Sequence, residues 1–77
     1  MPVQITIIGL GQTGASIGLA LAAHKDLISV TGHDKDYSAE TRAKKIGAVD
    51  TTNHNLPSSV EQADLIILAI PIHQIRE

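Results

Sequence analysis

The sequence predicts an α/β fold with a doubly wound parallel sheet, built in the order β-α-β-α-β-α-β. Short runs of β-branched apolar residues alternate with segments of helical periodicity, and the connections between them are short. The apolar residues are aliphatic, because Tyr37 is the single aromatic residue among 77. Strands that alternate with helices through short connections form parallel sheets with right-handed crossovers, and aliphatic runs suit buried parallel strands.

The first strand is expected at residues 3–8, VQITII, which are apolar, largely β-branched and followed by Gly9. A helix is expected from Gln12 onward, ending at the polar segment 24–26. Small residues at i, i+3, i+4 and i+7, with two larger neighbours, predict the face that lies on the sheet: Ala15, Gly18, Leu19, Ala22, Ile17 and Leu21.

The second strand is expected at residues 28–33, ISVTGH, and the second helix at residues 38–46. The apolar face of this helix should hold Ala39, Ala43 and Ile46. Glu40 and Lys44 are spaced i, i+4 and predict a surface ion pair. Gly47 is suited to the position that follows the last helical turn.

A short third strand is expected near residues 49–52, followed by a short helix. The start of this helix is predicted from Pro57 and the capping box Ser58-x-x-Glu61. Residues 64–70, DLIILAI, are apolar on both faces, which is typical of a central parallel strand. Such a strand would be an exposed edge if nothing followed, and residues 71–77 resemble the start of a helix. We therefore expect the chain to be a piece of a larger fold.

A glycine-rich turn is predicted between the first strand and the first helix. The segment Gly9-Leu10-Gly11-Gln12-Thr13-Gly14 reads G-x-G-x-x-G. In this context the first glycine permits a tight turn, the second lets the backbone approach a diphosphate, and the third allows close helix–strand packing. Amides near Gln12 and Thr13 should face the phosphates, aided by the helix dipole. A strand–helix turn without a ligand is the alternative.

Asp34 follows Gly14 by 20 residues, at the end of the second strand. An acid at this distance accepts hydrogen bonds from the ribose hydroxyls of a dinucleotide. A carboxylate would repel the 2′-phosphate of NADP, so NAD is favoured, although the neighbouring Lys35 would partly offset the repulsion. A turn or cap acid is the alternative role for Asp34, but Asp36 is the better candidate for capping. Together these features predict the mononucleotide half of a Rossmann-type fold.

The end of the fourth strand should form a second contact region for the cofactor. Ala69, Ile70 and Pro71 lie at the carboxyl end of a strand expected beside the first, where ligands bind in such sheets. A packing role for Ile70 is the alternative.

Several function classes are excluded by composition. A net charge of −2 argues against nucleic-acid binding, and the absence of cysteine excludes thiolate metal sites. The four histidines show no metal-binding spacing: His24, His33, His54 and His73. No apolar run approaches the ~20 residues of a membrane span, and we expect a cytoplasmic protein.

The sequence resembles the prephenate and arogenate dehydrogenase family over essentially its whole length. The segments that carry the resemblance are ITIIGLGQTGASIGLALA, VTGHDKD, KKIGAVD and ADLIILAIP. The resemblance implies that Gly9, Gly11, Gly14 and Asp34 bind the cofactor and that Ser16 matches a family serine. The chain departs from the family at Gln12, Thr13 and Ala15, which bears on the substrate and not on dinucleotide binding.

The resemblance implies that the chain is the N-terminal part, residues 1–77, of a dinucleotide-binding Rossmann domain. The full enzyme would oxidise and decarboxylate prephenate or arogenate for tyrosine synthesis, and would be a homodimer through a C-terminal part beyond this chain. The catalytic residues of the family also lie beyond residue 77, so this piece alone should be inactive. The alternatives are a reductase of the β-hydroxyacid or imine class and a non-catalytic nucleotide sensor, since a fold does not fix a function.

Overall fold

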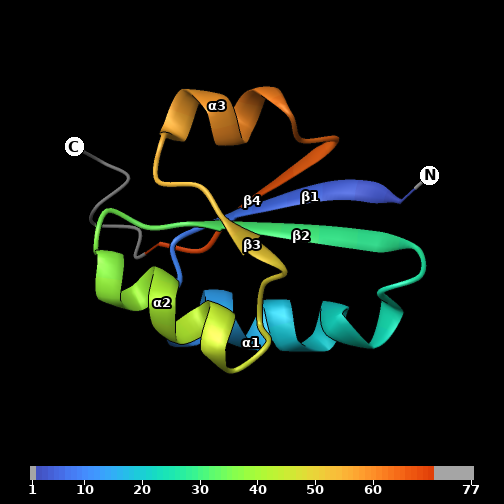
Figure 1. Cartoon of the computed structure of the whole chain (residues 1–77), viewed down its shortest axis with the longest axis horizontal. Helices are drawn as coiled ribbons and strands as arrows, with labels where there is room; N and C mark the ends of the chain where they lie inside the picture. Colours follow the sequence, from blue (N-terminus) through green and yellow to red (C-terminus); the bar gives the residue numbers. More distant parts are fainter. Residues whose placement is uncertain (1, 71–77) are drawn as a thin grey trace.

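The computed structural model describes residues 2–70, which form one parallel sheet with helices on both faces. The strands lie in the order β3-β2-β1-β4 (Figure 1). Their bounds are β1, Val3–Ile8; β2, Ile28–His33; β3, Thr51–Thr52; and β4, Leu65–Leu68. All neighbouring strands pair in parallel. The chain therefore moves outward from β1 to β3 and then crosses to the opposite side of β1, where β4 pairs.

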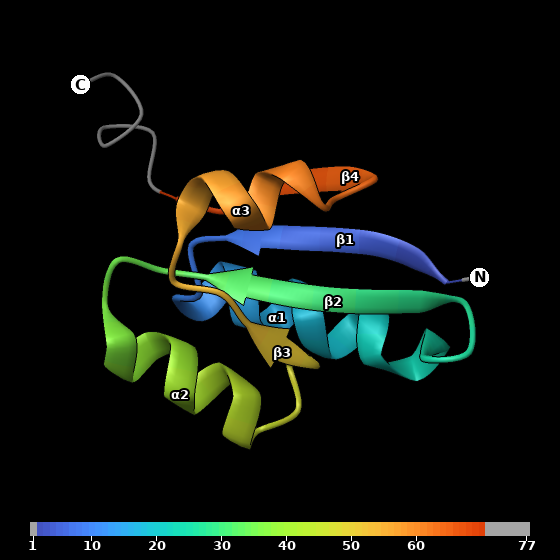
Figure 2. The same cartoon turned by 45° about the horizontal axis from the view of Figure 1, so that its top comes forward.

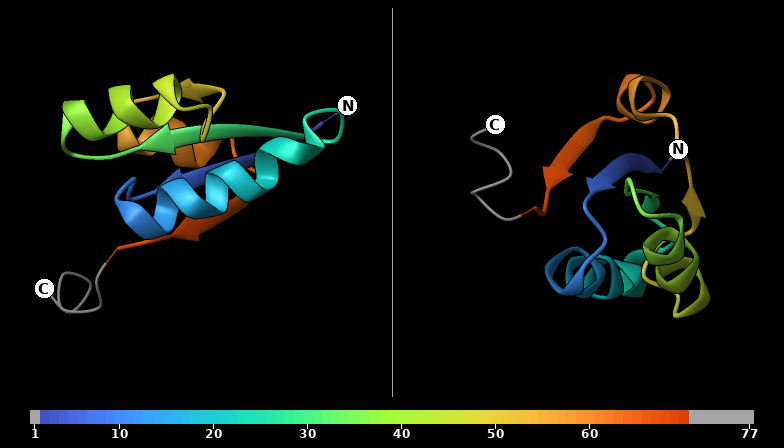
Figure 3. Two further views of the ribbon diagram at one scale, coloured as in Figure 1. Left: turned by 90° about the horizontal axis from the view of Figure 1, so that it is seen from below. Right: turned by 90° about the vertical axis from the view of Figure 1, so that its left-hand side faces the viewer.

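The helices confirm the doubly wound arrangement. Their bounds are α1, Gln12–Leu21, continued by the 3-10 turn η1, Ala22–His24; α2, Tyr37–Lys45; and α3, Leu56–Glu61. Helices α1 and α2 cover one face of the sheet and α3 covers the other (Figures 1 and 2). The end-on view in Figure 3 shows the three layers. The predicted order β-α-β-α-β-α-β is confirmed.

The core lies mainly between the sheet and the α1–α2 layer, and it is aliphatic as predicted. It consists of Ile5, Ile7, Leu10, Val30, Ala39, Ala43, Ala48 and Val49. Ile7, at the centre of β1, is fully buried, which is worth about 1.5–3 kcal/mol relative to an exposed side chain. Strands β1 and β2 begin and end where the sequence predicted.

Helix α1 contacts the rest of the chain through most of the residues predicted, with Gly14 in addition and Leu19 as the exception. Gly14 and Gly18 are its buried residues, with Ile17 and Leu21 packed beside them. The prediction for Leu19 is wrong, because its side chain is 47% exposed. A Cβ on Gly18 would run into the carbonyl of Ala48. Gly14 and Gly18 therefore lie where α1 comes closest to the rest of the chain, and Leu19 lies away from this contact.

Helix α2 buries Ala39 and Ala43 as predicted, but two other expectations for it are wrong. Ile46 stands at the C-cap and is 49% exposed, since it lies past the last helical turn. Glu40 does not pair with Lys44 on the surface; it is only 4% exposed and is turned inward. Gly47 follows the C-cap with φ +84°, as predicted.

The N-cap of helix α3 is Asn55, so the predicted box that starts at Ser58 is wrong. The side-chain oxygen of Asn55 accepts a hydrogen bond from the Ser58 amide at 2.9 Å. Pro57 lies in the first turn as expected, where its missing N–H costs nothing.

Strand β3 is shorter than predicted, and β4 lies at the edge of the described sheet and not at its centre. The apolar side chains of β4 are largely open: Leu65 is 52%, Ile66 40% and Leu68 59% exposed. β4 pairs with β1, as the sequence predicted for the fourth strand. Within residues 2–70, the structure has no helix long and apolar enough to cross a membrane. The strand end assigned to Pro71 and the helix expected at 71–77 lie outside the described residues.

Candidate functional site at the carboxyl edge of the sheet

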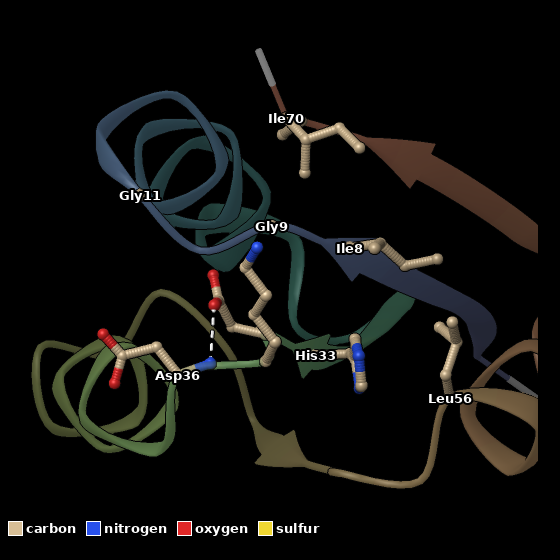
Figure 4. Close-up of a pocket in the computed structure, with 10 residues that line it drawn as sticks. Ile8, Gly9, Gly11, His33, Asp36, Leu56 and Ile70 are labelled. Atoms are coloured by element: carbon tan, nitrogen blue, oxygen red, sulfur yellow. Dashed lines mark hydrogen bonds between the residues drawn. The ribbon is translucent and has the colours of Figure 1, made fainter. Parts of the chain in front are cut away.

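A cleft of about 570 Å³ opens where β1 and β2 end (Figure 4). Residues from four places along the chain line it: the β1–α1 turn, the end of β2 with the residues after it, the start of α3, and the end of β4. They are Ile8, Gly9, Gly11, His33, Asp34, Lys35, Asp36, Leu56, Ala69 and Ile70. Parallel strands bring these ends to one edge of the sheet, which is where open α/β sheets bind ligands.

The turn after β1 is locked in place by Gly9. Its φ of +99° lies in the left-handed region, which glycine adopts without a steric penalty. Its amide donates to the His33 carbonyl at 2.8 Å. A Cβ here would lie 2.7 Å from the carbonyl oxygen of Ala69, so the backbones of β1 and β4 approach closely at this turn.

Gly14 and Gly11 have different surroundings, as the motif predicted. A Cβ on Gly14 would run into the carbonyl of Gly9, so Gly14 allows α1 to pack against its own turn. Among the described residues, nothing lies within 4 Å of a Cβ built on Gly11. Packing within the described structure therefore does not require glycine at position 11. A ligand that approaches the backbone from the cleft would require it.

The start of α1 presents amides that precede the helical hydrogen-bond ladder. The ladder begins with the Ala15 amide, which donates to the Gly11 carbonyl at 2.9 Å. The amides of Gln12, Thr13 and Gly14 come before it. The N-cap residue is Gly11, which has no side chain that could cap these amides, and the first turn of α1 contains no acid. A diphosphate supplies the negative charge that such a helix end favours.

Asp34 lines the cleft and is tied to the glycine turn. One carboxylate oxygen, Oδ2, accepts from the Leu10 amide at 2.8 Å. The other, Oδ1, accepts from the Asp36 amide at 2.9 Å, which is the dashed line in Figure 4. A carboxylate has about four acceptor positions, so these two bonds leave capacity for ribose hydroxyls. The acid lies at the cleft, where the sequence placed it.

Asp36 caps helix α2, which confirms the role given to it by the sequence. Its Oδ1 accepts from the hydroxyl of Ser38 at 2.7 Å and from the Ser38 amide at 2.9 Å. These bonds, the hydroxyl bond first, lower the pKa of Asp36 below the ordinary aspartate value, because they stabilise the ionised form. Lys35, between the two acids, is exposed at the rim of the cleft.

The end of β4 closes the side of the cleft opposite Asp34. Ala69 continues the pairing of β4 with β1, because its amide donates to the Ile8 carbonyl at 2.8 Å. Ile70 reaches the turn, where its Cγ2 lies 2.6 Å from the position a Cβ on Gly9 would take. Both residues line the cleft as predicted. Pro71, predicted beside them, lies outside the described residues.

Of the eleven residues predicted to bind the cofactor, six line the cleft together: Gly9, Gly11, Asp34, Lys35, Ala69 and Ile70. The side chain of Leu10 belongs to the core, and only its amide serves the site. Gln12 and Thr13 are exposed on the first turn of α1, and Gly14 is buried beneath it. Ser16 is also exposed.

Four lining residues are not among those predicted to bind the cofactor: Ile8, His33, Leu56 and Asp36, which was expected only as a helix cap. Ile8 and His33 each end a parallel strand, so the rule that strand ends share one edge was a signal for both. Leu56 begins α3 and faces His33 across the cleft (Figure 4). Leu56 was harder to predict at the cleft, because β3 has only two residues and its end is not evident from the sequence.

The residues present fit a dinucleotide. The open backbone at Gly11 and the amides at the start of α1 suit a diphosphate, and Asp34 suits a ribose. Ile8, Leu56 and Ile70 supply an apolar lining. Among the described residues, no group of His, Asp and Glu could hold a metal ion.

The similarities to known proteins agree with this geometry. The family model of the prephenate dehydrogenase nucleotide-binding domain matches residues 17–77. The chain is 38% identical over 69 residues to prephenate dehydrogenase of Lactococcus lactis and 32% identical over 69 residues to cyclohexadienyl dehydrogenase of Zymomonas mobilis. Each match covers 90% of this chain but only 19% and 24% of those two proteins.

A solved structure shares the fold. The crystal structure of prephenate dehydrogenase from A. aeolicus, in complex with hydroxyphenyl propionate and NAD+, superposes with a TM-score of 0.83 at 19% identity. The match covers 99% of this chain and 27% of that one. Taken with the family match, which spans most of the chain, these likenesses show that the chain belongs to the prephenate dehydrogenase family, within its nucleotide-binding domain.

Proposed function

We propose that the cleft binds the ADP half of NAD. The diphosphate lies over Gly11 and accepts from the amides at the start of α1, and the Asp34 carboxylate accepts from the adenine ribose hydroxyls. The observation that carries the proposal is the open space at Gly11, combined with a carboxylate tied to the same turn. The A. aeolicus relative, whose structure contains NAD+, supports the same assignment.

The preference for NAD over NADP rests on Asp34. At about 4 Å and an effective dielectric near 20, a carboxylate repels each charge of a 2′-phosphate by about 4 kcal/mol. Lys35 offsets part of this repulsion, but it is exposed and its charge is screened by solvent. We therefore expect NAD to bind more tightly than NADP.

The whole protein is proposed to be a dehydrogenase that oxidises prephenate or arogenate. The name of the Lactococcus lactis relative supports prephenate, and arogenate follows from the family resemblance of the sequence. NAD supplies the hydride acceptor, and this chain supplies the site that orients its ADP half. The catalytic residues, the substrate site and a homodimer interface are proposed to lie in the remainder of the protein, since the chain spans only 19% and 24% of those two relatives. A cytoplasmic location remains a prediction.

Titration of the chain with ADP-ribose, NAD and NADP, followed by calorimetry, tests the proposal. We expect ADP-ribose and NAD to bind and NADP to bind more weakly. Asp34→Ala should weaken ADP-ribose at least tenfold, because a hydrogen bond to a charged group is lost. Asp26→Ala is the matched control, since Asp26 is exposed and does not line the cleft. No binding of ADP-ribose, or equal binding to the Asp34→Ala chain, would contradict the proposal.

A further inference from the structure

Glu40 is a buried carboxylate whose contacts lead directly to Asp34. It lies on α2, is 4% exposed, and its Oε2 accepts a hydrogen bond from the backbone amide of Asp34 at 3.0 Å. The usual capping box would direct an acid in the first turn to the N-cap amide. Glu40 instead accepts from the amide of Asp34, two residues before the N-cap residue Asp36.

His54 holds Glu40 from the opposite side. Its Nδ1 lies 3.0 Å from the same Oε2 atom. A carboxylate oxygen accepts hydrogen bonds, and the tautomer of His54 with its hydrogen on Nδ1 is the one that donates to it. The His54 ring also stacks on Tyr37, with ring centroids 3.7 Å apart. The Asp34 amide and a fixed imidazole thus converge on a single oxygen.

The other imidazole near Glu40 serves a different partner. The Nδ1 of His33 lies 4.0 Å from Oε2 of Glu40 but only 3.0 Å from the carbonyl oxygen of Asn53. A carbonyl oxygen only accepts, so the Nδ1 hydrogen of His33 goes to Asn53. Glu40 is therefore held by His54, and Asp34 is held by Glu40.

Asp34 is consequently fixed at three points. Its amide donates to Glu40, its Oδ2 accepts from the Leu10 amide, and its Oδ1 accepts from the Asp36 amide. The peptide that joins His33 to Asp34 is held on its carbonyl side by the Gly9 amide and on its amide side by Glu40. The bond from Glu40 is the one on the side of Asp34, and it restrains the direction from which the carboxylate enters the cleft.

We propose that Glu40, braced by His54, is a positioning residue that aims the Asp34 carboxylate at the adenine ribose. A buried carboxylate is costly unless it is fully hydrogen-bonded, and an apolar residue of similar size is often at least as stabilising. The role in positioning gives a reason for an acid here. This inference rests on the proposed function, because it requires Asp34 to bind the ribose.

The test compares ADP with 2′-deoxy-ADP as ligands of the full chain. The two differ only in the 2′-hydroxyl, which is one of the ribose hydroxyls from which Asp34 is proposed to accept. The wild-type chain should bind ADP about tenfold more tightly, as expected for one hydrogen bond to a charged group. A loss of stability alone would weaken both ligands by the same factor and leave this ratio unchanged. The ratio therefore reports positioning.

Three variants separate the possibilities. In Glu40→Ala the ratio should fall to roughly one to three, because the Asp34 peptide loses the anchor on its amide side. In Glu40→Gln the ratio should stay near its wild-type value, because the amide oxygen can accept both hydrogen bonds. Glu61→Ala, which removes an exposed acid at the end of α3, is the matched control and should behave as wild type.

A Glu40→Ala chain that folds and keeps the wild-type ratio overturns the inference. If circular dichroism shows that Glu40→Ala does not fold, His54→Phe decides, because phenylalanine keeps the stack on Tyr37 but donates nothing to Glu40. A ratio lowered about threefold in His54→Phe supports the inference, and an unchanged ratio overturns it. Failure of the proposed function looks different: the wild-type chain would bind neither nucleotide, or Asp34→Ala would leave the ratio intact.

Discussion

The amide of Leu10 donates a 2.8 Å hydrogen bond to Oδ2 of Asp34. The bond joins the turn after β1 to the end of β2, and the Leu10 side chain anchors that turn in the core, where it is 2% exposed. The glycine-rich turn, proposed to bind the diphosphate, and Asp34, proposed to bind the ribose, are therefore held in a fixed relation before a ligand arrives. Preorganisation of this kind reduces the ordering cost of binding.

Gly11→Ala should impair nucleotide binding without unfolding the chain. Gly11 has φ −72°, which alanine adopts readily, and among the described residues no atom lies within 4 Å of the new Cβ. We expect the free energy of unfolding to change by less than about 1 kcal/mol. The new methyl group would occupy the space proposed for the diphosphate, so the affinity for ADP-ribose should fall about tenfold.

Gly14→Ala should instead lower the free energy of unfolding, without blocking the space proposed for the diphosphate. Its Cβ would collide with the carbonyl of Gly9, and overpacking of this kind costs about 1–3 kcal/mol. Thermal melts and calorimetry on the two variants check both statements. Unchanged ADP-ribose affinity in a folded Gly11→Ala chain would place the diphosphate elsewhere.

The sequence predicted the elements whose signals are local. Strands β1 and β2 follow from apolar runs that end at Gly9 and before Asp34, and the cap role of Asp36 follows from its place before a helical pattern. The glycine motif also located the turn correctly, because Gly9 and Gly14 answer short-range steric demands. Six of the lining residues of the cleft could be predicted, two from the glycine motif and four from their places at strand ends: Asp34, Lys35, Ala69 and Ile70.

The errors arose where tertiary packing decides. Helical spacing predicts Lys44 as the partner of Glu40 because it reveals only neighbours on the same helix, whereas the partners in the structure, Asp34 and His54, come from other segments. The same spacing predicts a buried Leu19 because the sequence does not show that Gly18 is the point of contact with Ala48. The rotation of a helix on its sheet depends on both surfaces.

Thr6→Val should lower stability by separating β1 from α3. The Thr6 hydroxyl donates a buried 2.8 Å hydrogen bond to the carbonyl of Ser59, and both residues are nearly inaccessible. Valine keeps the shape but leaves that carbonyl without its donor, at a cost of about 1–3 kcal/mol. Urea denaturation of Thr6→Val and Thr6→Ser checks this, since serine keeps the hydroxyl. Equal losses in the two variants would indicate that the methyl group matters instead.

The bonds of Asp36 to Ser38 predict that part of the stability is lost in acid. Because the pKa of Asp36 is lowered in the folded chain, the unfolded chain binds the proton more readily. This stability is fully present above the unfolded pKa of about 3.9 and is lost as the pH falls through the lower folded value. Thermal melts between about pH 2 and 6 should show a smaller pH dependence for Asp36→Asn. An identical dependence in wild type and Asp36→Asn would refute this assignment.

Asn55 should be replaceable by aspartate but not by alanine. Its side-chain oxygen caps α3 by accepting from the Ser58 amide at 2.9 Å. Alanine removes this acceptor at a cost of about 1 kcal/mol, which lowers the melting temperature by about 4–8 °C in a domain of this size. Aspartate keeps the acceptor and adds a charge that suits the helix N-terminus, so the melting temperature of Asn55→Asp should match or exceed that of wild type.

Since α3 carries Leu56 at the cleft, Asn55→Ala should also weaken ADP-ribose binding. Calorimetry would contradict that link if the affinity of a folded Asn55→Ala chain equalled that of wild type.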